Sequence, residues 1–150
     1  MSKETESADL ILKLYDLRRE ETMREGRKWF LNFMPADAAE ILQAMVDPKT
    51  SGFYRMVLSY WDMAASFANR GAIDREMFIE TSGEALVVFS KIEPFIEDIR
   101  AAMGNPAYAK NLEELAMSIP NAKEAMAGRR EMIKRMIEAR EKMAESAYSR

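Results

Sequence analysis

Apolar residues recur along most of this 150-residue chain at spacings of three and four, the repeat of an amphipathic α-helix. The clearest example is the segment about 53–70, whose apolar stripe consists of Phe53, Val57, Tyr60, Trp61, Ala64, Phe67 and Ala68. Alternating β-branched runs closed by Asn-Gly or Asp-Gly turns do not occur. The pattern therefore predicts an all-α protein, a helical bundle of five to six helices.

Capping residues and breakers give the expected limits of these helices. The first helix is expected from about Ser7, a capping serine, to about Phe33. The second follows Asp37 and ends near Val46, because Asp37 and Glu40 have the spacing of a capping box. A helical segment over residues 105–119 is expected to begin at an Asn-Pro pair.

A central antiparallel hairpin is expected from the segments about 53–70 and 75–103. Gly71 can close the first helix in a left-handed conformation, and Asp74 can cap the next. So short a connection predicts antiparallel neighbours. The second helix should kink near Pro94, whose ring removes one backbone hydrogen bond.

The whole chain, 1–150, is expected to form a single domain, because its length and 48% hydrophobic content suffice for one core. Residues 1–6 are expected to fray, and 121–150 to form a terminal amphipathic helix. The polar, acidic start lacks the pattern of a secretory signal, which favours a cytoplasmic location. The longest dense apolar run, 85–89, is too short to span a membrane. A net charge of -3 argues against nucleic acid as a partner.

Histidine and cysteine are both absent from the sequence, which removes most catalytic and metal-binding devices. Ser-His-Asp and Cys-His sites, zinc sites built from His or Cys, and His-ligated haem cannot be formed. The phosphate-binding motifs GxxxxGK[ST] and GxGxxG do not occur either. We therefore expect no enzyme, no cofactor and no metal, although chemistry based on carboxylates, Lys, Tyr or Ser stays open.

An acidic row is a candidate site for a hard cation. Glu76, Glu80 and Glu84 lie four residues apart, so on one helix they share a face that could hold magnesium. The same spacing is common on solvated helix edges. We favour the solvated edge.

Asp62 is the strongest candidate for a ligand-binding residue, because it follows Trp61 in the most apolar helix. A partly buried carboxylate there could anchor a small molecule in a pocket formed with Tyr60, Trp61 and Phe89. The alternatives are a wet stripe on an amphipathic helix, or a pair between Asp62 and an arginine of the first helix.

The last helix offers a candidate interface. Beyond Gly128, an apolar stripe is formed by Met132, Ile133, Met136, Ile137 and Met143. This stripe must be covered, either by a second subunit or partner, or within the chain by the aromatic residues Trp29, Phe30 and Phe33.

Three segments carry a resemblance to a known family: LILKLYDLRREE at 10–21, SYWDMAASFANRGAID at 59–74 and GEALVVFSKIEPFIEDIR at 83–100. Over roughly residues 8–120 the chain resembles a family of short, uncharacterised bacterial helical proteins, grouped as a domain of unknown function. The resemblance implies an all-α fold and supplies no activity.

The sequence thus favours a non-enzymatic helical protein that acts through protein-protein contacts, as a homo-oligomer or an accessory subunit. The expected partner is another protein or a second copy of the chain. A small-molecule-binding bundle with its pocket near Trp61 and Asp62 is the alternative, and an enzyme using carboxylates alone comes third.

Overall fold

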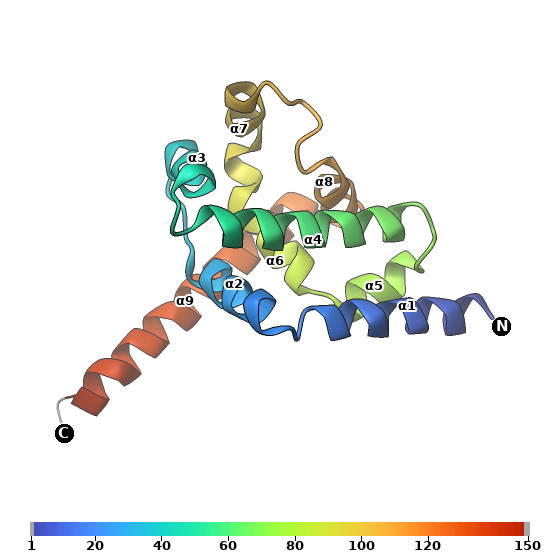
Figure 1. The fold of residues 1–150 in the computed structure, drawn as a ribbon, viewed down its shortest axis with the longest axis horizontal. Coiled ribbons are helices and arrows are strands. Elements are labelled where there is room, and N and C mark those ends of the chain that lie inside the picture. Colours follow the sequence, from blue (N-terminus) through green and yellow to red (C-terminus); the bar gives the residue numbers. More distant parts are fainter. Residues whose placement is uncertain (1, 149–150) are drawn as a thin grey trace.

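Every regular element in the computed structural model is helical over residues 2–148, the part of the chain that the structure describes (Figure 1). The elements in order are α1 (Lys3–Leu17), α2 (Glu21–Asn32), α3 (Ala38–Val46), α4 (Ser51–Asn69), α5 (Arg75–Thr81), α6 (Glu84–Ile92), the 3-10 turn η1 (Glu93–Phe95), α7 (Ile96–Met103), α8 (Lys110–Met117) and α9 (Ala122–Tyr148). The all-α class is confirmed. The helices outnumber the five to six expected, because two long segments are interrupted.

The segment 7–33, expected as one helix, forms two. α1 begins earlier than expected, at a cap formed by Ser2. The break comes at Glu20, whose carboxylate accepts hydrogen bonds from the backbone N–H groups of Thr22 and Met23 at 3.0 and 2.9 Å. These bonds satisfy backbone donors that lack partners at the start of a helix, so Glu20 acts as the cap of α2.

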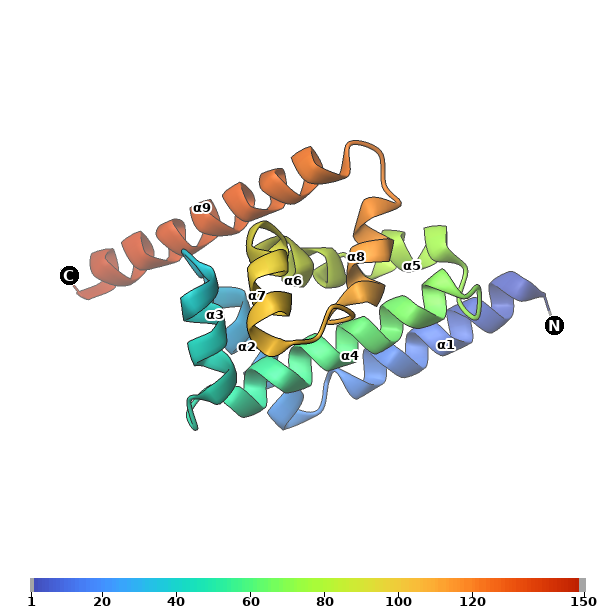
Figure 2. The same cartoon turned by 90° about the horizontal axis from the view of Figure 1, so that it is seen from above.

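The segment 75–103 is interrupted at the expected proline and at a second place. Pro94 lies in η1, between α6 and α7. Ser82 has φ -129° and ψ 46°, outside the helical region, and Gly83 precedes α6. α5, α6 and α7 therefore run in different directions (Figure 2). The second arm of the expected hairpin is thus a series of short helices, and α4 packs more extensively against α2 and α8 than against them.

α4 lies at the centre of the core. Its inward side chains, including Tyr54, Val57 and Trp61, are each about 1% exposed. α2 approaches α4 closely at Gly26, where a Cβ atom would lie 2.7 Å from Met56 Cε. A larger residue at this position would require the flexible end of the Met56 side chain to shift.

The connection between α7 and α8 is a turn rather than the start of a helix. Gly104 ends α7 as expected, with φ 64°. α8 begins only at Lys110, because Ala109 has φ 56° and the backbone leaves the helical region there. Arg100 holds this connection through a 2.9 Å hydrogen bond from Nε to the carbonyl of Tyr108.

Lys91 joins α6 to the C-terminal end of α2. Its side chain is 2% exposed, and its ammonium group donates hydrogen bonds to the carbonyls of Phe30, Leu31 and Phe33 at 2.5, 2.7 and 2.9 Å. The last carbonyls of a helix lack partners within the helix and carry partial negative charge. Burial lowers the pKa of Lys91 to about 7, while Glu84 raises it. The three carbonyl groups also favour the ammonium form, so Lys91 acts as the cap of α2.

Replacing Lys91 with methionine should lower the free energy of unfolding by about 3 kcal/mol, because one buried and two partly buried carbonyl groups lose their donor. Urea unfolding followed by circular dichroism at neutral pH measures the change. Lys49→Met removes the same charge at an exposed position and should change stability by no more than about 0.5 kcal/mol. Equal effects of the two substitutions would show that Lys91 does not close α2.

Candidate functional site

Arg27, Trp61 and Glu84 form a partly buried polar cluster between α2, α4 and α6. Arg27 donates from Nε and Nη2 to the two carboxylate oxygens of Glu84 at 2.9 and 3.0 Å. The indole Nε1 of Trp61 donates to the same carboxylate at 3.0 Å. Hydrogen bonding to Glu84 raises the pKa of the Arg27 guanidinium. Since these groups bind one another, the cluster ties the three helices together and leaves no polar group of Trp61 for a ligand.

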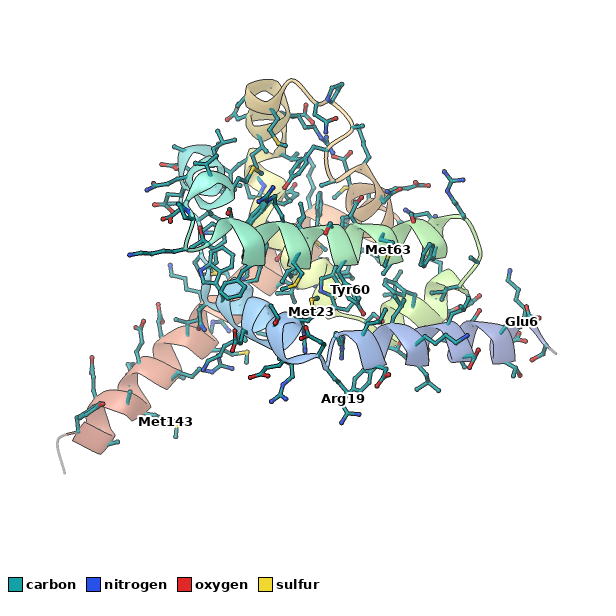
Figure 3. All side chains as sticks on the ribbon, in the orientation of Figure 1. Glu6, Arg19, Met23, Tyr60, Met63 and Met143 are labelled. Carbon is teal, nitrogen blue, oxygen red and sulfur yellow. The ribbon has the colours of Figure 1, made fainter. Side chains whose placement is uncertain are left out.

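The four residues expected to line one pocket face different parts of the protein. Tyr60, Trp61 and Asp62 are consecutive on α4 and therefore point about 100° apart. Tyr60 donates from its hydroxyl to the carbonyl of Leu14 on α1, on the lower side of α4 in Figure 3. Phe89 is completely buried in the core. The structure does not bring these four side chains to a common cavity.

Asp62 binds α8. Its carboxylate accepts hydrogen bonds from Nδ2 of Asn111 and from the backbone N–H of Leu112, both at 3.0 Å. Asn69, two turns further along α4, donates to the carbonyl of Asn111 at 2.9 Å. Asp62 is therefore paired with α8 and not with an arginine of the first helix. It attaches α8 to the core.

Asp62 also lines a surface groove of about 690 Å³, between α3, α4 and the connection from α7 to α8. Its apolar wall is formed by Leu42, Met45, Val46, Leu58 and Met103. Tyr54 and Tyr108 also contribute to the lining. This volume falls in the range of small-molecule sites, which combine apolar walls with a few polar groups.

The hydroxyl oxygens of Tyr54 and Tyr108 lie 2.7 Å apart and share a hydrogen bond. Burial raises the pKa of Tyr54 to about 12, although the bond from Tyr108 lowers it in part. Burial also raises the pKa of Tyr108, and the nearby Tyr54 and Asp62 raise it further. Both phenols are therefore protonated at neutral pH.

Sequence reasoning identified one residue of this groove, Asp62, and missed its other walls. A signal was present in α3, where Ile41 and Ala44 are buried in the core while Val46 is 76% exposed. A short helix that is apolar on more than one face has apolar surface left after it packs. No signal placed Tyr108 beside Tyr54, because that contact joins residues far apart in the sequence.

The acidic row does not share one helix face. α5 ends at Thr81, so Glu84 belongs to α6, while Glu76 and Glu80 are exposed on α5. The carboxylate of Glu84 already forms an ion pair with Arg27. Between residues 2 and 148, no three acidic side chains gather as a metal ion would need.

The five residues of the candidate interface on α9 divide into an inner and an outer set. Ile133 is buried against the body, and Ile137 is half-buried. The methionines are 50%, 42% and 74% exposed, in the order Met132, Met136 and Met143. Figure 3 shows Met143 on the end of α9 that extends beyond the other helices. Contact with a partner stays a prediction.

The aromatic residues of α2 do not cover this outer set. The ring of Trp29 stacks on Phe33, with centroids 4.8 Å apart, and Phe30 stacks on Tyr54 at 5.5 Å. These aromatics pack with one another and with α4. Met132, Met136 and Met143 therefore stay exposed within the described chain.

Alkaline pH should destabilise the fold through Tyr54. Its pKa is about 12 in the folded protein, whereas a tyrosine of an unfolded chain ionises near pH 10. Between about pH 10 and about pH 12 the unfolded state therefore binds fewer protons, and the free energy of unfolding falls as pH rises. Tyr54→Phe should make this slope shallower by up to about 1.4 kcal/mol per pH unit.

Urea unfolding at several pH values across this window measures the slope. Tyr148→Phe, at a position that is 93% exposed, is the control and should keep the slope of the unmodified chain. If Tyr54→Phe also keeps that slope, the Tyr54 phenol is not protected in the fold.

No helix between residues 2 and 148 combines the length and apolarity that crossing a bilayer requires. Neither the curated proteins nor the solved structures contain a significant match to this chain. A family model described as a domain of unknown function, DUF4760, matches residues 5–119, from α1 to the end of α8. The chain therefore belongs to the DUF4760 family.

Proposed function

We propose that this protein is a non-enzymatic helical module that acts through protein-protein contacts made by α9, and that its partner is a second copy of the chain. The observation that carries the proposal is the exposed methionine row, defined as Met132, Met136 and Met143. Residues four and seven apart share one helix face, so the three side chains form a continuous apolar strip. Flexible methionine side chains suit a surface that must adapt to a partner.

The outer half of α9 buries little surface against the rest of its own chain. Ile137 is the last partly buried residue of α9, and every described residue after it is exposed. A short helical segment without tertiary packing is marginal in water. Packing against another molecule would supply the burial that this segment lacks.

Basic side chains border the methionine row on both sides. At 100° per residue, Arg135 and Lys142 fall on one flank of the row and Arg140 on the other. The charged residues nearest the row are basic on both flanks, which disfavours pairing of α9 with itself. They favour an apolar strip that is bordered by acidic groups.

α1 presents a strip of that kind. Leu12 and Tyr15 are 66% and 49% exposed, and they lie three residues apart on one face. Asp9 and Asp16 fall beside Leu12 on the helix, and Glu4 lies on the other flank. Two cations partly balance these acids, because Lys13 pairs with Asp9 at 3.3 Å and the Arg18 guanidinium lies 4.6 Å from the centre of the Tyr15 ring. α1 and the outer half of α9 extend toward opposite ends of the molecule (Figures 1 and 2), so a contact between them requires two copies.

The mass of the protein in solution tests the proposal. Light scattering should show a dimer or larger species for the unmodified chain, and a folded monomer for Met132→Lys/Met136→Lys/Met143→Lys. Met63→Lys/Met117→Lys changes exposed methionines outside the row, 41% and 38% exposed, and should keep the mass of the unmodified chain. A monomeric unmodified chain would overturn the choice of a second copy and leave a different protein as the partner.

A charge exchange identifies α1 as the surface that receives α9. One variant carries Arg135→Glu/Lys142→Glu, the other carries Asp9→Lys/Asp16→Lys, and each alone should associate more weakly because like charges then face each other. An equimolar mixture should restore association, since the changed α9 of one variant then meets the changed α1 of the other. Failure of the mixture to associate would place the contact of α9 elsewhere.

A further inference from the structure

We propose that the groove between α3, α4 and the connection from α7 to α8 binds a compact, neutral organic molecule with an apolar body and one oxygen that accepts a hydrogen bond. The groove is separate from the exposed methionine row, because no residue of α9 lines it and the outer half of α9 extends away below α3 and α7 in Figure 1. This proposal is therefore independent of the proposed self-association. It rests on the size of the groove, the hydroxyl pair in it, and the charge that borders it.

The hydroxyl pair supplies a free donor. Tyr54 and Tyr108 together carry two hydroxyl protons, but the single 2.7 Å bond between their oxygens uses only one of them. Whichever tyrosine accepts that bond keeps a proton for a third group. Both side chains line the groove, and Tyr54 is 1% exposed. A ligand oxygen in the groove would give this proton the partner that a buried donor requires.

The groove lining carries no net charge, because Asp62 and Arg55 are its two charged residues. The carboxylate of Asp62 lies in the lining, where its negative charge would repel a second one. Its two oxygens already accept hydrogen bonds from Asn111 and Leu112, so it has a role without a cationic ligand. The only cation in the lining, Arg55, is exposed to solvent. A neutral ligand fits these surroundings best.

The wall opposite α4 is preorganised. Ala109 lies in the lining with φ 56°, a conformation that costs energy for a residue other than glycine. Arg100 fixes the adjacent Tyr108 through its carbonyl at 2.9 Å. Groups fixed before binding lose little freedom when a ligand enters, which favours affinity. The strain at Ala109 thus sits where a rigid wall is useful.

Prodan, a neutral naphthalene dye with one ketone oxygen, is a suitable probe because its emission reports both apolar surroundings and hydrogen bonding to the ketone. We expect saturable binding of one dye per chain, with emission shifted to the blue. Ala107→Phe adds a ring at an exposed position in the lining and should weaken binding at least tenfold. Ala101→Phe, also exposed but outside the groove lining, should bind prodan like the unmodified chain.

Tyr54→Phe/Tyr108→Phe removes the donor and keeps the shape of the groove. Binding should weaken about fivefold, the effect of one neutral hydrogen bond, and the emission should lose the component due to hydrogen bonding. The anionic dye anilinonaphthalene sulfonate should bind more weakly than prodan. Absence of saturable prodan binding, equal binding by Ala107→Phe and the unmodified chain, or tighter binding of the anionic dye would each overturn the proposal. Ala107 is exposed, so Ala107→Phe should fold. This variant therefore tests the proposal even if the double tyrosine variant does not fold.

Discussion

The structure depends on the position of α4 among other helices. Successive residues along α4 therefore bind different neighbouring helices. Tyr60 binds α1, Trp61 binds Glu84 on α6, and Asp62 binds the first turn of α8. The helical repeat of about 100° per residue imposes this division. Three consecutive polar groups on a central helix thus fix three other helices, and for the same reason they cannot line one pocket.

The groove is a consequence of how α8 is attached. Asp62 satisfies the backbone N–H of Leu112, which holds the start of α8 against α4. The connection before α8 must then leave the helical path, as it does at Ala109, and it stands away from α3. The hollow between them is lined largely by apolar residues. A structural constraint on one helix therefore creates the surface on which we base ligand binding.

Local signals in the sequence predicted the helical class and several helix ends, because capping and breaking act within a few residues. Asp37 accepts a hydrogen bond from the backbone of Glu40, and Gly71 has φ 81°, both as expected. The cap at Glu20 was missed, since glutamate is a rarer cap than serine or aspartate and lay in a charged stretch. The groove could not be predicted from the sequence, for another reason. The pairing of Tyr54 with Tyr108 depends on how the helices pack, which periodicity does not contain.

The two proposed surfaces differ in their relation to the family. Residues 5–119 match the family model, and every residue that lines the groove falls within that range. α9 begins at Ala122, after the matched residues, so the exposed methionine row lies outside them. The groove is therefore built from the shared domain alone, whereas the contact needs α9 as well as α1. Binding in the groove and association through α9 can consequently change independently, because substitutions in one surface leave the residues of the other untouched.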